Sequence, residues 1–306
     1  MISIIICSRE SDISEGLKNN LRETIGLDYE LILVDKTEHR QSIFKAYNVG
    51  IDRAKFDTLC FIHDDILFHT PQWGSVVLEQ LSNHSVGFIG VAGGSVAPRV
   101  PAQWNFDTHF INLLQYKKKR RYSILREGAS FNNRSFQPVV TLDGVFLACR
   151  KDLLKNIRFD ELSFTGFHCY DLDITLQAHC EGFENRVINN LLLEHFSEGK
   201  YDRKWVECQL SLWRKWKRKL PFSLIQQSDE VLFDKEIYYM EHHFTRRMVR
   251  RGFSNQQIMN VFKEYNDLNK STGLGFATMN ILRLTWIRLK TKPTSLLKFY
   301  SANTEK

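Results

Sequence analysis

The first 65 residues alternate between short apolar runs and segments with helical spacing, and this alternation constrains the fold more than any other feature of the chain. Three runs rich in β-branched residues predict strands: Ile2–Cys7, Tyr29–Val34 and Thr58–Ile62. The segments between them predict two helices, one from a cap at Ser11-Asp12 to Thr24, closed by Gly26, and one over residues 41–54. This βαβαβ order predicts an α/β fold with a parallel sheet and right-handed crossovers.

Polar residues follow each of the three predicted strands. Ser8 and Arg9 follow the first strand, Asp35 follows the second, and His63-Asp64-Asp65 follow the third. Because ligands of open α/β sheets lie beyond the carboxyl ends of the strands, we expect these side chains to converge on one edge. Neither the GxGxxG pattern nor a P-loop follows the first strand, which disfavours a classical dinucleotide or P-loop site.

Two adjacent carboxylates end the octet LCFIHDDI, which contains no lysine or arginine. Asp64 and Asp65 repel each other unless a cation neutralises them. Mg²⁺ or Mn²⁺ takes one or two protein carboxylates and completes its shell with phosphate oxygens, which a bound diphosphate supplies. The alternative is that the two aspartates cap a following turn, and the strand-end position favours the metal.

The chain of 306 residues is 43% hydrophobic and 25% charged, an ordinary globular composition. Residues 1–200 hold 22 Lys and Arg against 25 Asp and Glu, whereas residues 201–306 hold 20 against 10. We therefore expect one large domain over residues 1–200 and a basic helical extension over residues 201–306. Its segment WRKWKRKLPF suits an anionic membrane surface or, equally, a helix packed by its tryptophans. No nucleic-acid motif accompanies the charge, so a nucleic-acid partner is not expected.

Six scattered cysteines without a CxxC pair favour a reducing, cytoplasmic location over a disulfide framework or a zinc site. No uncharged apolar stretch approaches the roughly 20 residues that a membrane-spanning helix needs. If the protein contacts a membrane, we therefore expect peripheral attachment to its inner face.

Four elements in order, ISIIICSR, ELILVDK, AYNVGI and CFIHDDI, resemble the nucleotide-sugar-binding half of family 2 glycosyltransferases with the GT-A fold. In that family the last element carries a metal motif, and one branch has HDD there. TLDGVFLACRKDLL (141–154) is similar to the family's acceptor-side strand. The resemblance covers about residues 1–200 and implies a mostly parallel, Rossmann-like sheet flanked by helices, with a C-terminal helical extension.

The resemblance also implies roles for single residues. Asp65 and His195 would bind the metal, although a lone histidine is more often structural. Five residues would contact the nucleotide sugar together with Ser8 and Arg9: Asp35, Asn48, Asp64, Asp143 and Gly144. Asp35 has the alternative of a solvated turn residue. The family often has Arg where AYNVG has Tyr47, and Arg9 or Arg150 could hold the phosphates in its place.

The segment FDELSFTGFHCYDLDITLQAHCEGF (159–183) is similar to the family segment that carries a Glu-Asp motif. Tyr170-Asp171 stand at its place, so Asp171 would be the catalytic base and Tyr170 is a departure from the pattern. The alternative is that Asp171 or Asp173 caps a helix that begins near Ile174. His63 would shape the site.

The resemblance thus implies a metal-dependent, inverting glycosyltransferase that uses Mn²⁺ or Mg²⁺ and a nucleoside-diphosphate sugar. The acceptor would be a glycan, a lipid-linked sugar or a protein, as in the synthesis of cell-surface polysaccharides. A homo-oligomer and an anionic membrane surface are further partners that we consider. The alternative from another class is a non-catalytic sugar-nucleotide-binding or membrane-associated assembly protein.

Overall fold

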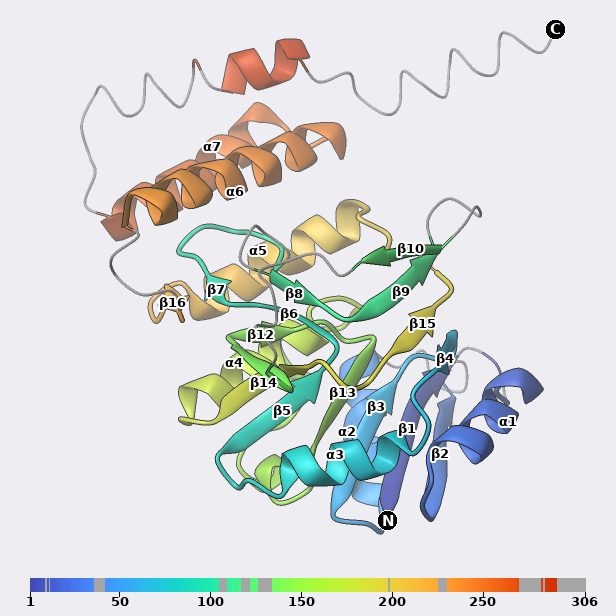
Figure 1. Ribbon diagram of the computed structural model, residues 1–306. Helices are drawn as coiled ribbons and strands as arrows, with labels where there is room; N and C mark the ends of the chain where they lie inside the picture. The colour runs from blue at the N-terminus through green and yellow to red at the C-terminus, as the bar shows by residue number, and fades with distance from the viewer. Residues whose placement is uncertain are drawn as a thin grey trace, which may run out of the picture. The chain divides into compact units, whose positions relative to one another are not determined.

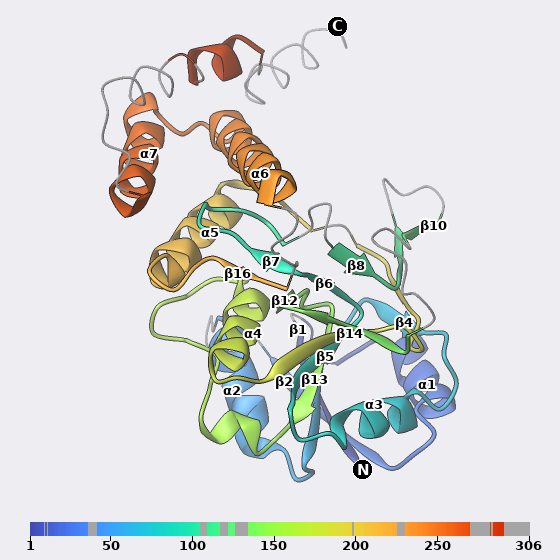
Figure 2. The ribbon, with the colours of Figure 1, turned by 60° about the vertical axis from the view of Figure 1, so that its left-hand side comes forward.

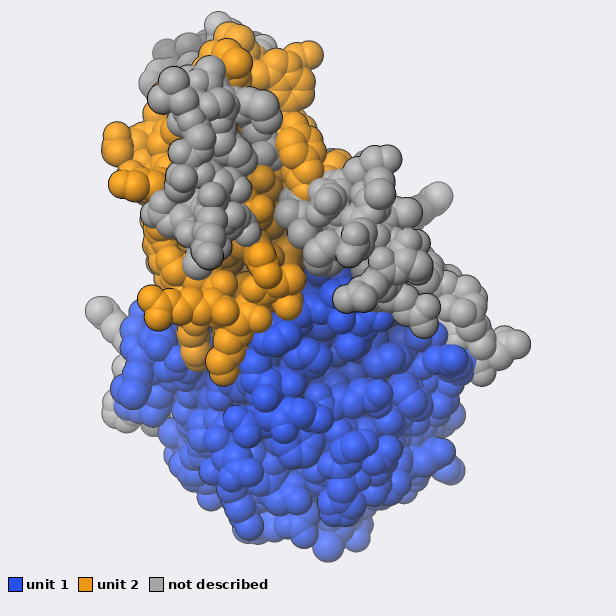
Figure 3. Space-filling view, turned by 90° about the vertical axis from the view of Figure 1, so that its left-hand side faces the viewer, with its two compact units in different colours: residues 1–97, 104–199, 222–226 blue, residues 98–103, 200–221, 227–306 orange. Residues whose placement is uncertain are grey.

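The computed structural model describes residues 1–8, 10, 12–35, 42–104, 109–116, 122–125, 134–197, 199–224, 230–269, 282 and 284–290. Two compact units are coloured in Figure 3: residues 1–97, 104–199 and 222–226 form unit 1, and residues 98–103, 200–221 and 227–306 form unit 2. The assignment of catalysis to residues 1–200 and of a basic extension to residues 201–306 stays a prediction.

The main sheet of unit 1 has seven strands in the spatial order β11-β14-β5-β13-β3-β1-β2 (Figure 1). Their bounds are β1 Ile2–Ser8, β2 Tyr29–Asp35, β3 Thr58–Ile62, β5 Val86–Gly90, β11 Phe136–Val139, β13 Phe146–Arg150 and β14 Glu184–Ile188. β1 pairs in parallel with β2 and β3, as β5 does with β14. β13 is antiparallel to β3 and β5, and β11 to β14. The α/β expectation is confirmed, but the sheet is mixed because an antiparallel strand lies between β3 and β5.

Three smaller sheets have the orders β10-β9-β15-β4, β12-β6-β8 and β16-β7. Their strands are β4 Ile66–Phe68, β6 Ala92–Gly94, β7 Val96–Ala97, β8 His109–Ile111, β9 Leu113–Tyr116, β10 Tyr122–Leu125, β12 Thr141–Leu142, β15 Leu193–His195 and β16 Phe222–Ser223. The sheet that contains β4 and β15 matters most here, because its pairing joins the segment after β3 to the segment that ends at His195.

Helices cover both faces of the main sheet (Figure 2). In unit 1 these are α1 Glu15–Thr24, α2 Ile43–Arg53, α3 Trp73–Leu81 and α4 Tyr170–Cys180, with a short 3₁₀ turn at Leu153–Lys155. α1 and α3 pack on the face of β1 that carries Ile4 and Ile6, in a core that includes Trp73 stacked on Phe68 with ring centroids 4.2 Å apart. α2 packs on the opposite face, where Gly50 lies against Ile5.

The first helix begins later than the sequence pattern predicts. Ser14, and not Ser11-Asp12, is its N-cap, and the Ser14 hydroxyl accepts a hydrogen bond from the Leu17 amide at 3.2 Å. Gly26 follows the helix with φ of 73°, a left-handed conformation that suits glycine. The predicted strands and the second helix agree with β1, β2, β3 and α2 to within a residue or two.

Unit 2 contains α5 Arg203–Trp216, α6 Glu230–Arg250 and α7 Asn255–Asn269, and residues 284–290 are also helical. Trp205, Trp213 and Trp216 of α5 are buried, as the packing alternative for WRKWKRKLPF requires. None of the helices within the described ranges is both long enough and apolar enough to cross a bilayer. Contact of this basic segment with an anionic membrane stays a prediction.

Gly50→Ala tests the close approach of α2 to β1. A Cβ at Gly50 would overlap the Ile5 side chain, which is buried and β-branched. Overpacking of this kind costs about 1–3 kcal/mol, so we expect the free energy of unfolding in urea to fall by that amount. Gly16→Ala is the matched control, because Gly16 is an exposed glycine inside α1 where a Cβ would meet only the Ser14 hydroxyl, at an ordinary contact distance of 3.9 Å. It should be neutral or stabilising by up to ~1 kcal/mol. Equal effects of the two variants would contradict the packing argument.

Candidate active site and metal centre

The candidate site lies at the carboxyl end of β3, where His63-Asp64-Asp65 connect β3 directly to β4. His195 ends β15, and the antiparallel register places His195 opposite Ile66, the residue after Asp65. The Phe196 amide donates a hydrogen bond to the Asp65 carbonyl at 3.0 Å and extends this pairing. Backbone pairing therefore brings together two segments that are far apart in the sequence.

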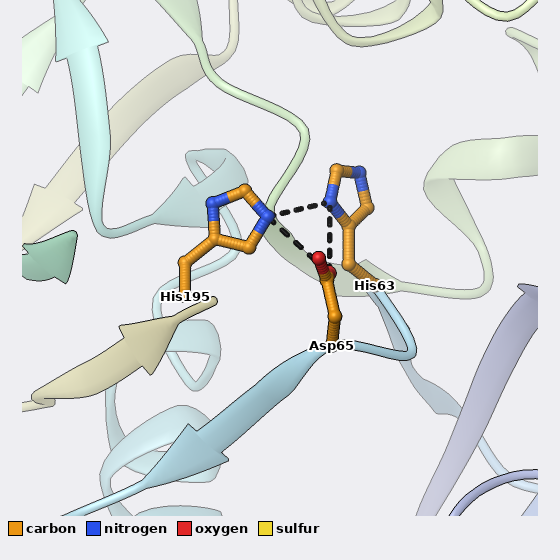
Figure 4. A group of neighbouring side chains, drawn as sticks. All are labelled: His63, Asp65 and His195. Carbon is orange, nitrogen blue, oxygen red and sulfur yellow. Dashed lines mark hydrogen bonds and ion pairs between the residues drawn. The ribbon is translucent and has the colours of Figure 1, made fainter. Parts of the chain in front are cut away.

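His63, Asp65 and His195 form a cluster that could hold a metal ion (Figure 4). His195 Nε2 lies 3.3 Å from Asp65 Oδ1, and His63 Nδ1 lies 3.4 Å from His195 Nε2 and 3.9 Å from Asp65 Oδ1. Two imidazole nitrogens and one carboxylate oxygen facing a common point are a usual donor set for divalent transition metals. The residues predicted to bind metal, Asp65 and His195, are thus adjacent, and His63 joins them.

Hydrogen bonds orient His195 toward this point. Its Nδ1 lies 3.1 Å from Gln115 Oε1, and the Gln115 amide nitrogen donates to the Ser197 carbonyl, which fixes the amide oxygen toward the ring. His195 must therefore carry a proton on Nδ1, and the neutral ring presents an Nε2 lone pair to the Asp65 carboxylate. A cation, or a second proton on the ring, makes that approach favourable. The residues present fit a bound metal.

The ionisation states also suit a cation. Burial favours the neutral form of Asp65, but a His195 ring that carries a second proton and donates it from Nε2, together with a hydrogen bond from Ser197, outweighs burial and holds the pKa of Asp65 below its usual range. Burial and the neighbouring His195 lower the pKa of His63. An ionised carboxylate and a neutral imidazole are the forms that bind metals.

Ser8 lies under the site and not at its surface. The Ser8 side chain is buried and donates a hydrogen bond from its hydroxyl to Asp64 Oδ2 at 2.8 Å. Parallel pairing of β1 with β2 places Asp35 beside Ser8 at the same edge of the sheet. Arg9 and the side chain of Asp35 lie outside the described part of the chain. Their predicted contacts with the donor stay predictions, as does that of Asp64.

Asp171 lies in the first turn of α4, which begins at Tyr170 and not near Ile174. The N-cap position is Cys169, whose side chain makes no capping hydrogen bond. Asp171 is therefore not the N-cap residue; its Oδ2 accepts a hydrogen bond from the Gly144 amide at 2.9 Å, and its carboxylate is also hydrogen bonded by the Leu172 amide of the same helix. Asp173 is buried and accepts a hydrogen bond from Gln177 one turn later.

Asp143 and Gly144 adjoin Asp171 from the segment that precedes β13. Asp143 Oδ2 accepts from the Trp104 indole and Oδ1 from the Val145 amide, both at 3.0 Å. Burial, together with the charge of Asp143, raises the pKa of Asp171 to about 7. A carboxyl group with such a pKa can take up a proton at neutral pH, as a general base must.

Two residues from the sequence analysis are engaged elsewhere. Asn48 lies in α2 and donates a hydrogen bond from its buried amide to the Phe159 carbonyl at 2.9 Å, so its donor contact stays a prediction. Arg150 pairs in register with Thr58 at the start of β3, and its guanidinium donates to the Val86 and His84 carbonyls. Arg150 therefore lies at the amino-terminal end of β3, whereas His63 follows its carboxyl end. The suggestion that Arg150 holds phosphates is wrong.

Four residues at the site make contacts that could not be predicted from the sequence: His63, Trp104, Gln115 and Tyr170. His63 carries a local signal, since it stands next to the two aspartates at a strand end, and Tyr170 stands at the place of the Glu-Asp motif. Trp104 and Gln115 belong to segments without a motif, and their contacts depend on the tertiary fold.

Asp171→Asn should change how stability depends on pH. The pKa of Asp171 is raised in the folded chain, so between about pH 4 and 7 the folded state holds a proton that the unfolded chain has released. Wild-type stability therefore falls as pH rises through this window, whereas the amide of the variant stays neutral and its oxygen still accepts from Gly144. We expect the melting temperature of Asp171→Asn minus that of the wild type to increase from pH 5 to pH 8 by a few degrees. A difference independent of pH would contradict the raised pKa.

Comparison with solved structures finds 167 chains, among them two that share low identity with this chain. One is A197 from STIV, with 15% identity, a TM-score of 0.40, and coverage of 64% of this chain and 86% of that one. The other is GalNAc-T7 with UDP, GalNAc and Mn²⁺, with 9% identity, a TM-score of 0.48, and coverage of 78% and 55%. A search of the curated proteins finds no match.

A family model described as "Glycosyltransferase like family" matches residues 3–218. The match spans most of the chain and includes His63, Asp65, Asp171 and His195. It confirms the resemblance to glycosyltransferases found in the sequence motifs. The chain therefore belongs to this glycosyltransferase-like family.

Proposed function

We propose that the protein is a metal-dependent, inverting glycosyltransferase that moves a sugar from a nucleoside-diphosphate sugar to an acceptor hydroxyl. One observation carries the proposal: a carboxyl group with a pKa of about 7 is joined by hydrogen bonds to a His-Asp-His cluster. Transfer of a sugar to a hydroxyl needs both parts, a base for the acceptor proton and a cation for the departing diphosphate.

His63, Asp65 and His195 would hold the metal at the end of β3. When bound, the metal supplies positive charge that offsets the charge developing on the diphosphate leaving group. Two imidazoles favour Mn²⁺ over Mg²⁺, which prefers carboxylate and water oxygens. Three protein ligands leave coordination positions open for the diphosphate oxygens.

Asp171 would accept the proton from the acceptor hydroxyl as its oxygen forms a bond with the anomeric carbon. The hydrogen bond from the Gly144 amide fixes the direction of the carboxylate, and burial with Asp143 nearby keeps its proton affinity high. In one displacement the new bond forms opposite to the diphosphate, so the configuration at the anomeric carbon inverts. The raised pKa of Asp171, about 7, makes it the carboxyl group that we assign as the base.

The acceptor would be a glycan, a lipid-linked sugar or a protein. The alternative, a non-catalytic sugar-nucleotide-binding or assembly protein, would bind the donor without turnover. The raised pKa of Asp171 favours the enzyme, because a binding protein has no use for a base that titrates near neutral pH.

A nucleotide-dependent thermal shift tests the metal site. We expect one of UDP, GDP, CDP and dTDP to stabilise the protein only with Mn²⁺, by about 2.7 kcal/mol at 100-fold excess over its Kd. Asp65→Asn should abolish the effect of Mn²⁺, because it removes an ionised ligand from the cluster. Asp152→Asn, an exposed aspartate next to Arg150 at the opposite edge of the sheet, should keep it. A thermal shift that is equal with and without Mn²⁺, and equal in the wild type and in Asp65→Asn, would contradict the proposal.

Release of nucleoside diphosphate from a panel of sugar nucleotides, with water as acceptor, tests the base. Asp171→Asn should lower the rate by about 10²–10⁴-fold while the Mn²⁺-dependent thermal shift by nucleotide persists. The wild-type rate should rise as pH passes through about 7, since the ionised form of Asp171 accepts the proton. Binding without turnover in the wild type, unchanged by Asp171→Asn, would support the assembly protein instead.

A further inference from the structure

Tyr170 stands where the family pattern has glutamate, and the structure gives this tyrosine a central position. It is the first residue of α4, its side chain is buried, and four rings pack around it: Phe44, Tyr47, Phe159 and Phe167. Its hydroxyl is the polar end of an otherwise apolar packing unit. The contacts of that hydroxyl therefore determine what Tyr170 does.

The Tyr170 hydroxyl joins the metal cluster to the base. Tyr170 Oη lies 2.9 Å from His63 Nε2 and 2.9 Å from the Gly144 carbonyl oxygen. The amide of the same Gly144 donates to Asp171 Oδ2 at 2.9 Å. A candidate metal ligand and the candidate base are thus separated by one tyrosine and one glycine.

An inventory of protons fixes the direction of these hydrogen bonds. A carbonyl oxygen only accepts, so the single proton of the Tyr170 hydroxyl points to Gly144. The Tyr170 oxygen then has only lone pairs left for its other two neighbours, so the Tyr47 hydroxyl donates to one of them and His63 faces the other. His63 must carry its proton on Nε2 and donate it to Tyr170, which leaves Nδ1 without a proton. Nδ1 is the nitrogen that faces His195 and Asp65.

We propose that Tyr170 is a positioning residue that locks His63 in the Nε2–H tautomer and thereby makes Nδ1 the third ligand of the metal. The inference rests on the proposed function for the metal, but it concerns a tautomer that exists before any metal binds. Ligating histidines generally donate their other ring N–H to an acceptor that fixes the ring, and here a phenol oxygen takes that place.

The surroundings explain why a neutral acceptor serves here. The position is buried and adjoins Asp171, with Asp143 close by. A buried carboxylate at residue 170 would add a third negative charge to this pair, which is costly without a partner. A phenol accepts the His63 proton without that charge. Gly144 is part of the same arrangement, because a Cβ at residue 144 would overlap the Tyr170 hydroxyl.

Tyr170→Phe, with Tyr47→Phe as matched control, tests the proposal. Tyr47 is a second buried tyrosine whose hydroxyl hydrogen bonds to Tyr170 and not to His63 in the described contacts. We would measure the Kd for Mn²⁺ without nucleotide from the electron paramagnetic resonance signal of free Mn²⁺. Tyr170→Phe should weaken binding by about 10–100-fold, and Tyr47→Phe should leave it unchanged.

The tautomer is measured separately in the metal-free protein. Ring ¹⁵N shifts, assigned to His63 by their loss in His63→Gln, should show a proton on Nε2 in the wild type. Tyr170→Phe should shift this population toward Nδ1–H, whereas Tyr47→Phe should not.

Each outcome decides a different claim. If the wild type binds Mn²⁺ and Tyr170→Phe binds it equally well, the inference fails while the metal site stands. If the wild type does not bind Mn²⁺, the metal part of the proposed function fails, and with it the ligand role of Nδ1. A wild-type His63 with its proton on Nδ1 overturns the inference by itself, even if Tyr170→Phe does not fold.

Discussion

The antiparallel pairing of β4 with β15 is the interaction on which the site depends. It holds His195 beside Asp65 through backbone hydrogen bonds, which are insensitive to the charges at the edge of the sheet. Without a cation or a second proton on His195, the Asp65 carboxylate and the ring lone pairs repel one another. A rigid backbone scaffold can hold groups in an arrangement that they would leave if free, and that arrangement is what a cation requires.

The backbone also holds Asp171 in a position that its charge disfavours. Its carboxylate is held near Asp143 by the Gly144 amide, although ionising both acids together is unfavourable. The raised pKa of Asp171 lowers the stability of the fold at neutral pH, and it gives a carboxyl group that titrates in the range where a base is useful. The buried strands β1 and β3 and the aromatic core around Trp73 supply the stability that makes this arrangement tolerable.

The parts of the fold that follow from local pattern could be predicted from the sequence. The βαβαβ start depends on β-branched runs and caps within a few residues, and topology alone predicts that Ser8, Asp35 and Asp64 share an edge. The antiparallel insertion of β13 could not be predicted, because its register joins Ala148 to Cys60 on one side and to Ile89 on the other, both distant in sequence. The start of α4 differs from the prediction for a related reason: Tyr170 begins that helix through tertiary packing and not through a capping side chain.

Gly144 and Tyr170 lie 26 residues apart in sequence, yet the space at one is defined by the hydroxyl at the other. A side chain at residue 144 is compatible with the fold only after the tyrosine ring and hydroxyl at residue 170 have been replaced, whereas replacing the tyrosine leaves the glycine in place. Substitutions at the two positions must therefore occur in a fixed order as lineages diverge. Tyrosine at residue 170 has to be replaced before glycine at residue 144 can be. Among descendants of this chain, a glycine opposite a residue other than tyrosine would mark the intermediate step, and an alanine opposite tyrosine should be the rarest pairing.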